Sequence, residues 1–80
     1  MFKALNKNQI LLLKKIKTNS KFTITALIET VSRENKVPVS TLKLNAKILK
    51  NLGLIEFGNS HGVKLTSSGV LILNLMGCDL

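Results

Sequence analysis

The chain has 80 residues, of which 45% are hydrophobic, so it is expected to form one domain with a real core and not a disordered segment. Twelve Lys and Arg residues against four Asp and Glu give a net charge of +8. This balance favours a nucleic acid or an anionic membrane surface as partner, although a lysine-rich proteome from an AT-rich genome produces it too. A single cysteine excludes an intramolecular disulfide, and no apolar run is long enough for a signal peptide or a membrane span. We therefore expect one soluble, cytoplasmic domain over residues 1–80.

Two helices are expected in the first half of the chain. Residues 6–18 place apolar side chains on one stripe and lysines on the opposite face, with Asn6 as the N-cap. Residues 21–24 alternate and suggest a very short strand, after which Thr25 is the expected N-cap of a second helix. That helix must end before Pro38, because the residue before a proline is disfavoured in the α-helical region.

A third helix is expected between Ser40, as its N-cap, and about Leu52, with Gly53 at the left-handed C-cap position. Four apolar positions fall within one arc of this helix and are expected to pack on the first two helices. They are Leu42, Ala46, Leu49 and Leu52.

A hairpin and a final helix complete the expected fold. Residues 54–57 and 63–65 predict two strands, joined by a turn at residues 58–62 that is rich in glycine and polar residues. Thr66 is the expected cap of a helix that runs through Met76. The predicted order is helix, short strand, helix, helix, two-stranded hairpin and helix, which is an α+β, mainly α, domain.

Four segments of the chain carry a family resemblance. They are Gln9-Ile10-Leu11-Leu12-Leu13, Ser40-Thr41-Leu42, Leu49-Lys50-Asn51-Leu52-Gly53-Leu54-Ile55 and Leu65-Thr66-Ser67-Ser68-Gly69. Over residues 8–69 the chain resembles the winged helix-turn-helix superfamily, in particular small archaeal regulators and the multiple-antibiotic-resistance regulator family. The resemblance implies that the third helix is a recognition helix and that residues 58–62 form a wing. It does not imply one function, because winged helices also bind proteins and RNA.

The third helix holds the main functional signal. Lys43, Lys47 and Lys50 share the face opposite to the apolar arc. In the resembled family this helix enters the major groove, so we expect it to contact double-stranded DNA, although lysines often merely solvate an exposed helix face. The candidate DNA-binding residues on the helix are Ser40, Thr41, Lys43, Leu44, Lys47, Lys50 and Asn51.

Further candidate contacts flank this helix. Hydroxyl and free backbone N–H groups at its N-terminus suit a phosphate, and Ser40 equally suits a simple N-cap. The expected wing adds Asn59, Ser60, His61 and Lys64, and the ends of the second helix add Lys21 and Lys36 as backbone clamps or plain surface residues. Because lysine is a point charge and the wing lacks arginine, we expect backbone-dominated binding with modest sequence selectivity.

Leu44 and Ile48 form an apolar pair beside the lysine face. By its distance from Gly53, Leu44 lies where the family often places a polar base-reading residue. It can touch thymine methyl groups, pack under the second helix or, with Ile48, face a protein partner. The alternative to a DNA-binding transcriptional regulator is therefore an interaction module of a larger replication, transcription or membrane-remodelling assembly. Binding of structured RNA is a third hypothesis.

The final helix is apolar nearly all round. It predicts a homodimer that presents two recognition helices to successive major-groove turns, unless the helix lies in a deep groove that buries most of it. The expected interface residues are Val70, Leu71, Leu73, Leu75 and Met76.

No pattern for catalysis is found in the sequence. The only histidine, His61, lies in the expected turn, and the four acidic residues are scattered, so no nucleophile has an obvious base. No cluster of His and Cys has the spacing of a metal site, and no glycine-rich phosphate loop follows a strand. We expect a non-enzymatic protein without metal or cofactor and without a membrane partner.

Overall fold

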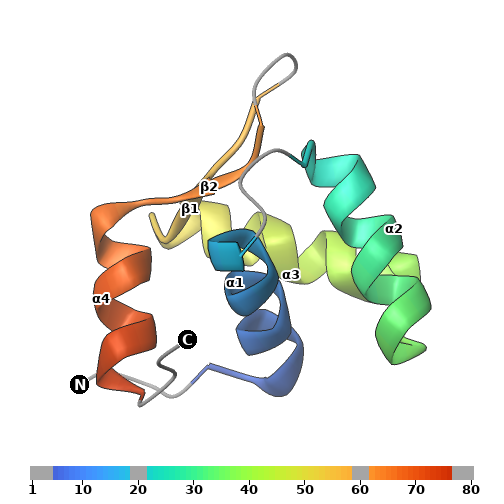
Figure 1. The fold of residues 1–80 in the computed structure, drawn as a ribbon, viewed down its shortest axis with the longest axis horizontal. Helices are drawn as coiled ribbons and strands as arrows, with labels where there is room; N and C mark the ends of the chain where they lie inside the picture. The colour runs from blue at the N-terminus through green and yellow to red at the C-terminus, as the bar shows by residue number, and fades with distance from the viewer. Residues whose placement is uncertain (1–4, 19–21, 59–61, 77–80) are drawn as a thin grey trace.

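The computed structural model describes residues 5–18, 22–58 and 62–76. These residues form four helices and one two-stranded antiparallel sheet (Figure 1). In chain order the elements are α1 (Lys7–Thr18), α2 (Ile24–Asn35), α3 (Val39–Asn51), β1 (Ile55–Glu56), β2 (Lys64–Leu65) and α4 (Ser67–Leu75). The domain is therefore mainly helical with a small sheet, as the expected α+β, mainly α, class requires.

Helix α1 lies at the centre of the domain and contacts α2, α3, α4 and β2. Figure 1 shows α2 and α4 on opposite sides of it. Its N-cap is Asn6, as predicted: the Gln9 N–H donates to Asn6 Oδ1 over 2.8 Å, and the Asn6 N–H donates to Gln9 Oε1 over 3.1 Å. This reciprocal capping box satisfies two backbone donors that the helix itself leaves free. The start of α1 was thus correctly predicted from the sequence.

The predicted strand at residues 21–24 is wrong where the structure describes it, because Ile24 already begins α2. Thr23, and not Thr25, is the N-cap: its hydroxyl accepts the Ala26 N–H over 3.2 Å. This segment makes a backbone hydrogen bond of the kind found between strands: the Val63 N–H donates to the Phe22 carbonyl over 2.8 Å. A threonine hydroxyl that satisfies a free helix donor outweighs the weak β preference of these residues.

The connection between α2 and α3 is short and tightly bonded. Helix α2 ends at Asn35, ahead of Pro38 as predicted, and Lys36 adopts the left-handed conformation with φ 56°. The predicted N-cap Ser40 is wrong, since α3 begins at Val39 and Pro38 occupies the cap position. The Pro38 carbonyl accepts the Leu42 N–H over 3.2 Å. The fixed φ of proline already suits the entry to a helix, so no side-chain cap is needed there.

Helix α3 buries Leu42, Ala46 and Leu49 against the rest of the core, as predicted. Leu52 does not join them and stays exposed, because the helix ends at Asn51 and the chain turns away at Leu52. Gly53 follows with φ 78°, which confirms the expected left-handed position. The buried set instead gains a polar member, Asn45, which the sequence pattern did not indicate.

The hairpin strands are shorter than predicted, with Ile55 paired to Leu65 and Glu56 to Lys64. Thr66 caps α4 as predicted: its hydroxyl accepts the Gly69 N–H over 3.0 Å and donates to the Gly53 carbonyl over 2.6 Å. Because Gly53 lies two residues after the end of α3, this hydroxyl ties the exit of α3 to the start of α4. The last helix ends at Leu75, one residue before the predicted limit.

The core draws on every helix and on the hairpin. Its buried hydrophobic side chains are Leu12, Leu13, Ile16, Leu27, Ile28, Val31, Leu42, Ala46, Leu49, Leu54, Ile55, Val63 and Leu73. With one side of α3 held in this core, the opposite side of the helix faces solvent. Among the described residues, no helix combines the length and apolar character that crossing a membrane requires.

Candidate nucleic-acid interface

The exposed side of α3 brings together most of the candidate residues from that helix. Lys43, Lys47, Lys50 and Asn51 are all exposed, and no acidic residue occurs anywhere in α3. Ser40 is exposed in the first turn, and Thr41 is half-buried. The helix therefore presents three exposed lysines without an acidic neighbour on the helix, and we call them the α3 lysine face (Lys43, Lys47 and Lys50).

The charge of this face is not neutralised by neighbouring carboxylates. In the described parts of the chain the ion pairs lie elsewhere, between Lys15 Nζ and Glu34 Oε1 at 2.9 Å and between Lys64 Nζ and Glu56 Oε1 at 3.8 Å. Lys43 and Lys47 have no carboxylate within salt-bridge distance among these residues. Two ammonium groups on one exposed helix face are thus available to an external anion.

Lys50 is held by a different contact. Its ammonium lies 4.4 Å from the centre of the Phe57 ring, which follows β1. An ammonium over an aromatic face is attracted by the negative charge density of the ring. The contact positions Lys50 between α3 and the hairpin, and the sequence did not indicate it because the two residues meet only through the turn at Gly53.

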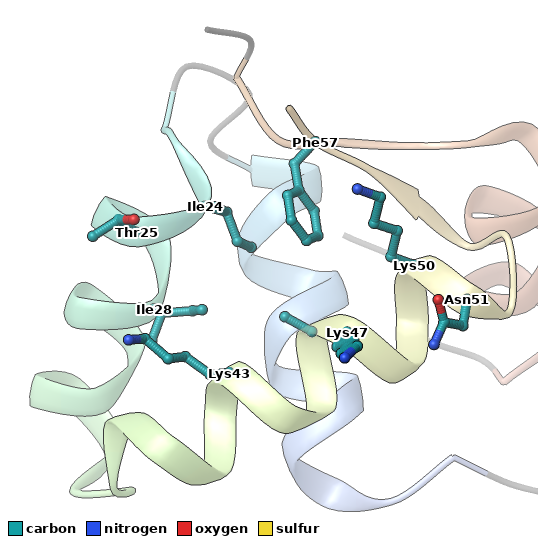
Figure 2. A pocket seen from close by; sticks show the side chains of 9 residues that line it. Ile24, Thr25, Ile28, Lys43, Lys47, Lys50, Asn51 and Phe57 are labelled. Atoms are coloured by element: carbon teal, nitrogen blue, oxygen red, sulfur yellow. The ribbon is translucent and has the colours of Figure 1, made fainter. Parts of the chain in front are cut away.

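A groove with a volume of about 440 Å³ lies beside the α3 lysine face. Figure 2 shows α2 on one side, α3 on the other, and the Phe57 ring pointing into the space between them. Apolar side chains of the lining are Ile24, Ile28, Ala46 and Phe57, and the polar ones are Thr25, Lys43, Lys47, Lys50 and Asn51. The groove was not predicted from the sequence, because its lining comes from three separate segments.

A second surface of α3 is apolar. Leu44, Ile48 and Leu52 follow one another at intervals of four residues and are 61%, 36% and 58% exposed, respectively. We call this stripe the α3 apolar ridge. Its exposure contradicts the interpretation that Leu44 packs under the second helix. Contact with thymine methyl groups and contact with a protein partner both stay open for this residue.

The flanking candidates are placed only in part. Lys36 is exposed at the C-terminal end of α2, three residues before α3 begins. Lys64 is exposed on β2, with its charge shared with Glu56. The remaining four candidates, Lys21, Asn59, Ser60 and His61, lie outside the described residues.

Helix α4 exposes one apolar side. Val70, Leu71 and Leu75 are exposed there, and Met76 is half-buried just beyond the helix. Leu73 was also predicted to lie in an interface between two copies, but it is fully buried in the core of its own chain. It faces the side opposite to Leu71 and Leu75, so it is corrected to a core residue.

Comparison with known proteins adds no further constraint. No protein-family model, no curated protein and no solved structure matches the chain. Within residues 5–18, 22–58 and 62–76, no group of three or more His, Cys, Asp or Glu residues lies together so as to hold a metal ion. The function has to be inferred from the charge and shape of the described surface.

Proposed function

We propose that the chain is a winged-helix protein that binds double-stranded DNA and acts as a small transcriptional regulator. The observation that carries the proposal is the α3 lysine face, whose positive charge has no acidic neighbour on the helix and whose Lys43 and Lys47 have no carboxylate partner in the described residues. The order of three helices, an antiparallel hairpin and a fourth helix supports the winged-helix assignment. In that arrangement α3 is the recognition helix.

The dimensions of α3 suit this role. Its 13 residues extend over about 20 Å, and the major groove is about 12 Å wide, enough to admit a helix. Asn51 lies near the middle of the exposed arc, opposite the buried residues, and would reach towards base edges, while Lys47 beside it would contact a phosphate. Lys43 and Lys50 flank them on the side of the groove and would contact phosphates. Since each lysine offers a point charge, contacts to the DNA backbone would dominate the affinity.

The test is fluorescence anisotropy of a labelled DNA duplex, titrated with the protein over a series of salt concentrations. A phosphate-contacting protein loses affinity log-linearly with salt, with a slope of about 0.9 per phosphate contact. The double variant Lys43→Gln with Lys47→Gln is expected to lower the magnitude of this slope by about 1.8. Its affinity should fall for all duplex sequences alike.

A matched control separates a specific face from bulk charge. Lys14 and Lys17 are exposed on α1, and replacing both by Gln removes the same net charge. We expect this control to bind nearly as the parent protein does. Equal losses in the two double variants, or an unchanged slope in the α3 variant, would refute the role of the α3 lysine face.

The α3 apolar ridge favours a second candidate function, a winged-helix module that binds another protein within a larger assembly. Three exposed aliphatic side chains in one row are unusual beside a charged surface and suit an apolar partner. Leu44→Ser with Ile48→Ser distinguishes the two functions. If the protein binds DNA, this variant should keep the salt slope of the parent protein. If the parent protein itself fails to bind duplex DNA at low salt, the interaction module is favoured.

We further propose that α4 forms a two-fold interface with a second copy of the chain. Val70, Leu71 and Leu75 supply an exposed apolar surface that a partner helix would cover. Leu71→Asp is expected to shift the protein from dimer to monomer in sedimentation equilibrium and to weaken binding to a DNA with two half-sites. A parent protein that sediments as a monomer at all concentrations would refute this assembly.

A further inference from the structure

The groove beside α3 combines an apolar interior with a cationic rim. Ile24 and Ile28 of α2, Ala46 of α3 and the ring of Phe57 supply the apolar surface. Figure 2 shows three lysines that leave α3 around this space, with the Lys43 side chain directed towards Ile28 of α2 and the Lys50 side chain beside the Phe57 ring. Such a surface is complementary to a molecule that is apolar at one end and negatively charged at the other.

The volume of the groove indicates the size of the molecule that can occupy it. Sites for small molecules in proteins commonly measure about 300–1,000 Å³, and the groove, at about 440 Å³, falls at the lower end of that range. The surface of its lining is mainly apolar, because the carbon stems of the lysines add to the four apolar side chains, and this is the usual composition of such sites. The volume therefore fits one compact ligand.

The charges define the ligand further. Lys43 and Lys47 have no carboxylate partner in the described residues, and the Lys50 ammonium lies over the Phe57 ring. Three point charges of one sign around an apolar space disfavour a cation and favour an anion. Ammonium groups impose no bidentate geometry, so a single carboxylate, sulfonate or phosphate suits them.

We propose that the groove between α2, α3 and Phe57 binds a small amphipathic anion, with its apolar body against Ile24, Ile28 and Phe57 and its head group among Lys43, Lys47 and Lys50. The bound head group offsets part of the positive charge of the α3 lysine face and occupies space that a DNA phosphate would take. A ligand of this class therefore competes with DNA and releases the protein from it. This last consequence rests on the proposed function, whereas binding of the anion does not.

The probe is anilinonaphthalene sulfonate, which carries one negative charge on an aromatic body and becomes fluorescent in an apolar site. The protein is expected to bind it saturably, with one molecule per chain. Phenylnaphthylamine has the same apolar body without the charge, and it is expected to bind at least about threefold more weakly, because three exposed charge interactions are lost.

Variants locate the bound probe. Lys43→Gln with Lys47→Gln is expected to weaken probe binding about three- to tenfold, as loss of two exposed charge interactions predicts. Phe57→Ala is expected to weaken it as well, and circular dichroism reports whether that variant is folded. The controls are Lys14→Gln with Lys17→Gln, which removes equal charge from α1, and Val39→Ser, which removes an exposed apolar side chain from the start of α3, outside the groove. Both controls should bind the probe as the parent does.

The outcomes separate the inference from the proposed function. Absence of saturable probe binding, equal affinity for the uncharged analogue, or loss of binding in the Val39→Ser control would each overturn the groove site. Probe binding that is lost in the α3 lysine variant supports the site, even if no duplex DNA binds, in which case the DNA-binding proposal alone fails. If DNA binds, added probe should lower its affinity in the parent protein, and an unchanged affinity would overturn the competition.

Discussion

Replacing Gly69 by alanine is expected to destabilise the domain, although alanine is the better helix former. Gly69 lies in the first turn of α4, where its N–H donates to the Thr66 hydroxyl. A Cβ atom at this position would lie well inside van der Waals distance of the Leu54 carbonyl oxygen and 3.4 Å from Cδ2 of Leu65. Because the blocking oxygen belongs to the backbone, no change of rotamer removes the overlap, and α4 must move away from Leu54.

The change in the free energy of unfolding combines contributions of opposite sign. Alanine is favoured over glycine within a helix by about 0.8–1 kcal/mol. Overpacking a tight site costs about 1–3 kcal/mol. Movement of α4 also strains the bonds from Thr66 to the Leu54 and Gly53 carbonyls, which are 3.1 Å and 2.6 Å long and contribute about 1 kcal/mol each. The free energy of unfolding should therefore fall by about 1–3 kcal/mol.

The measurement is urea unfolding followed by circular dichroism. With a denaturant dependence of about 1 kcal/mol per molar urea for a small domain, the midpoint should fall by about 1–3 M. Ser68→Ala is the matched control, because Ser68 is exposed in the same turn. It should leave the midpoint unchanged or raise it slightly. A Gly69→Ala midpoint equal to or above that of the parent would refute the argument from backbone contact.

Three further changes test the contacts that hold the helices. Asn45→Ala removes a buried amide that accepts from Asn6 Nδ2 over 3.1 Å and donates to the Thr41 carbonyl over 2.9 Å. The free energy of unfolding should fall by about 1–3 kcal/mol in the same urea assay. An unchanged midpoint would contradict a stabilising role for these two hydrogen bonds. Thr23→Ala removes the N-cap of α2 and should cost about 1 kcal/mol, whereas equal stability would imply that water replaces the cap. Glu34→Gln breaks the partly exposed pair with Lys15 and should change the stability by less than about 1 kcal/mol; a larger loss would show that the pair is more strongly coupled than its exposure suggests.

The predictions from sequence succeeded where a single residue controls the local backbone. Pro38 limits α2 and Gly53 ends α3 because the φ angles available to these residues restrict the chain directly. Asn6 and Thr66 cap helices because their side chains reach backbone donors only a few residues away.

Predictions failed where two local interactions compete. The segment before α2 has residues that favour a strand, yet the hydroxyl of Thr23 caps a helix there. Ser40 is a good N-cap residue, yet the helix begins earlier because Pro38 is already compatible with helix entry. In both cases the energies differ by about 1 kcal/mol or less, so local preference does not decide the outcome.

The sequence by itself determined the order of the four helices and the hairpin, the apolar side of α3 and the placement of the lysines away from it, because helical periodicity is a property of consecutive residues. Tertiary structure alone decided that Leu73 belongs to the core, that Leu52 stays exposed and that Asn45 meets Asn6. It also created the groove, since Ile28, Lys47 and Phe57 come from segments that meet only when the chain is folded. Contacts of this kind depend on how α2, α3 and the hairpin pack, and no pattern within one segment specifies that packing.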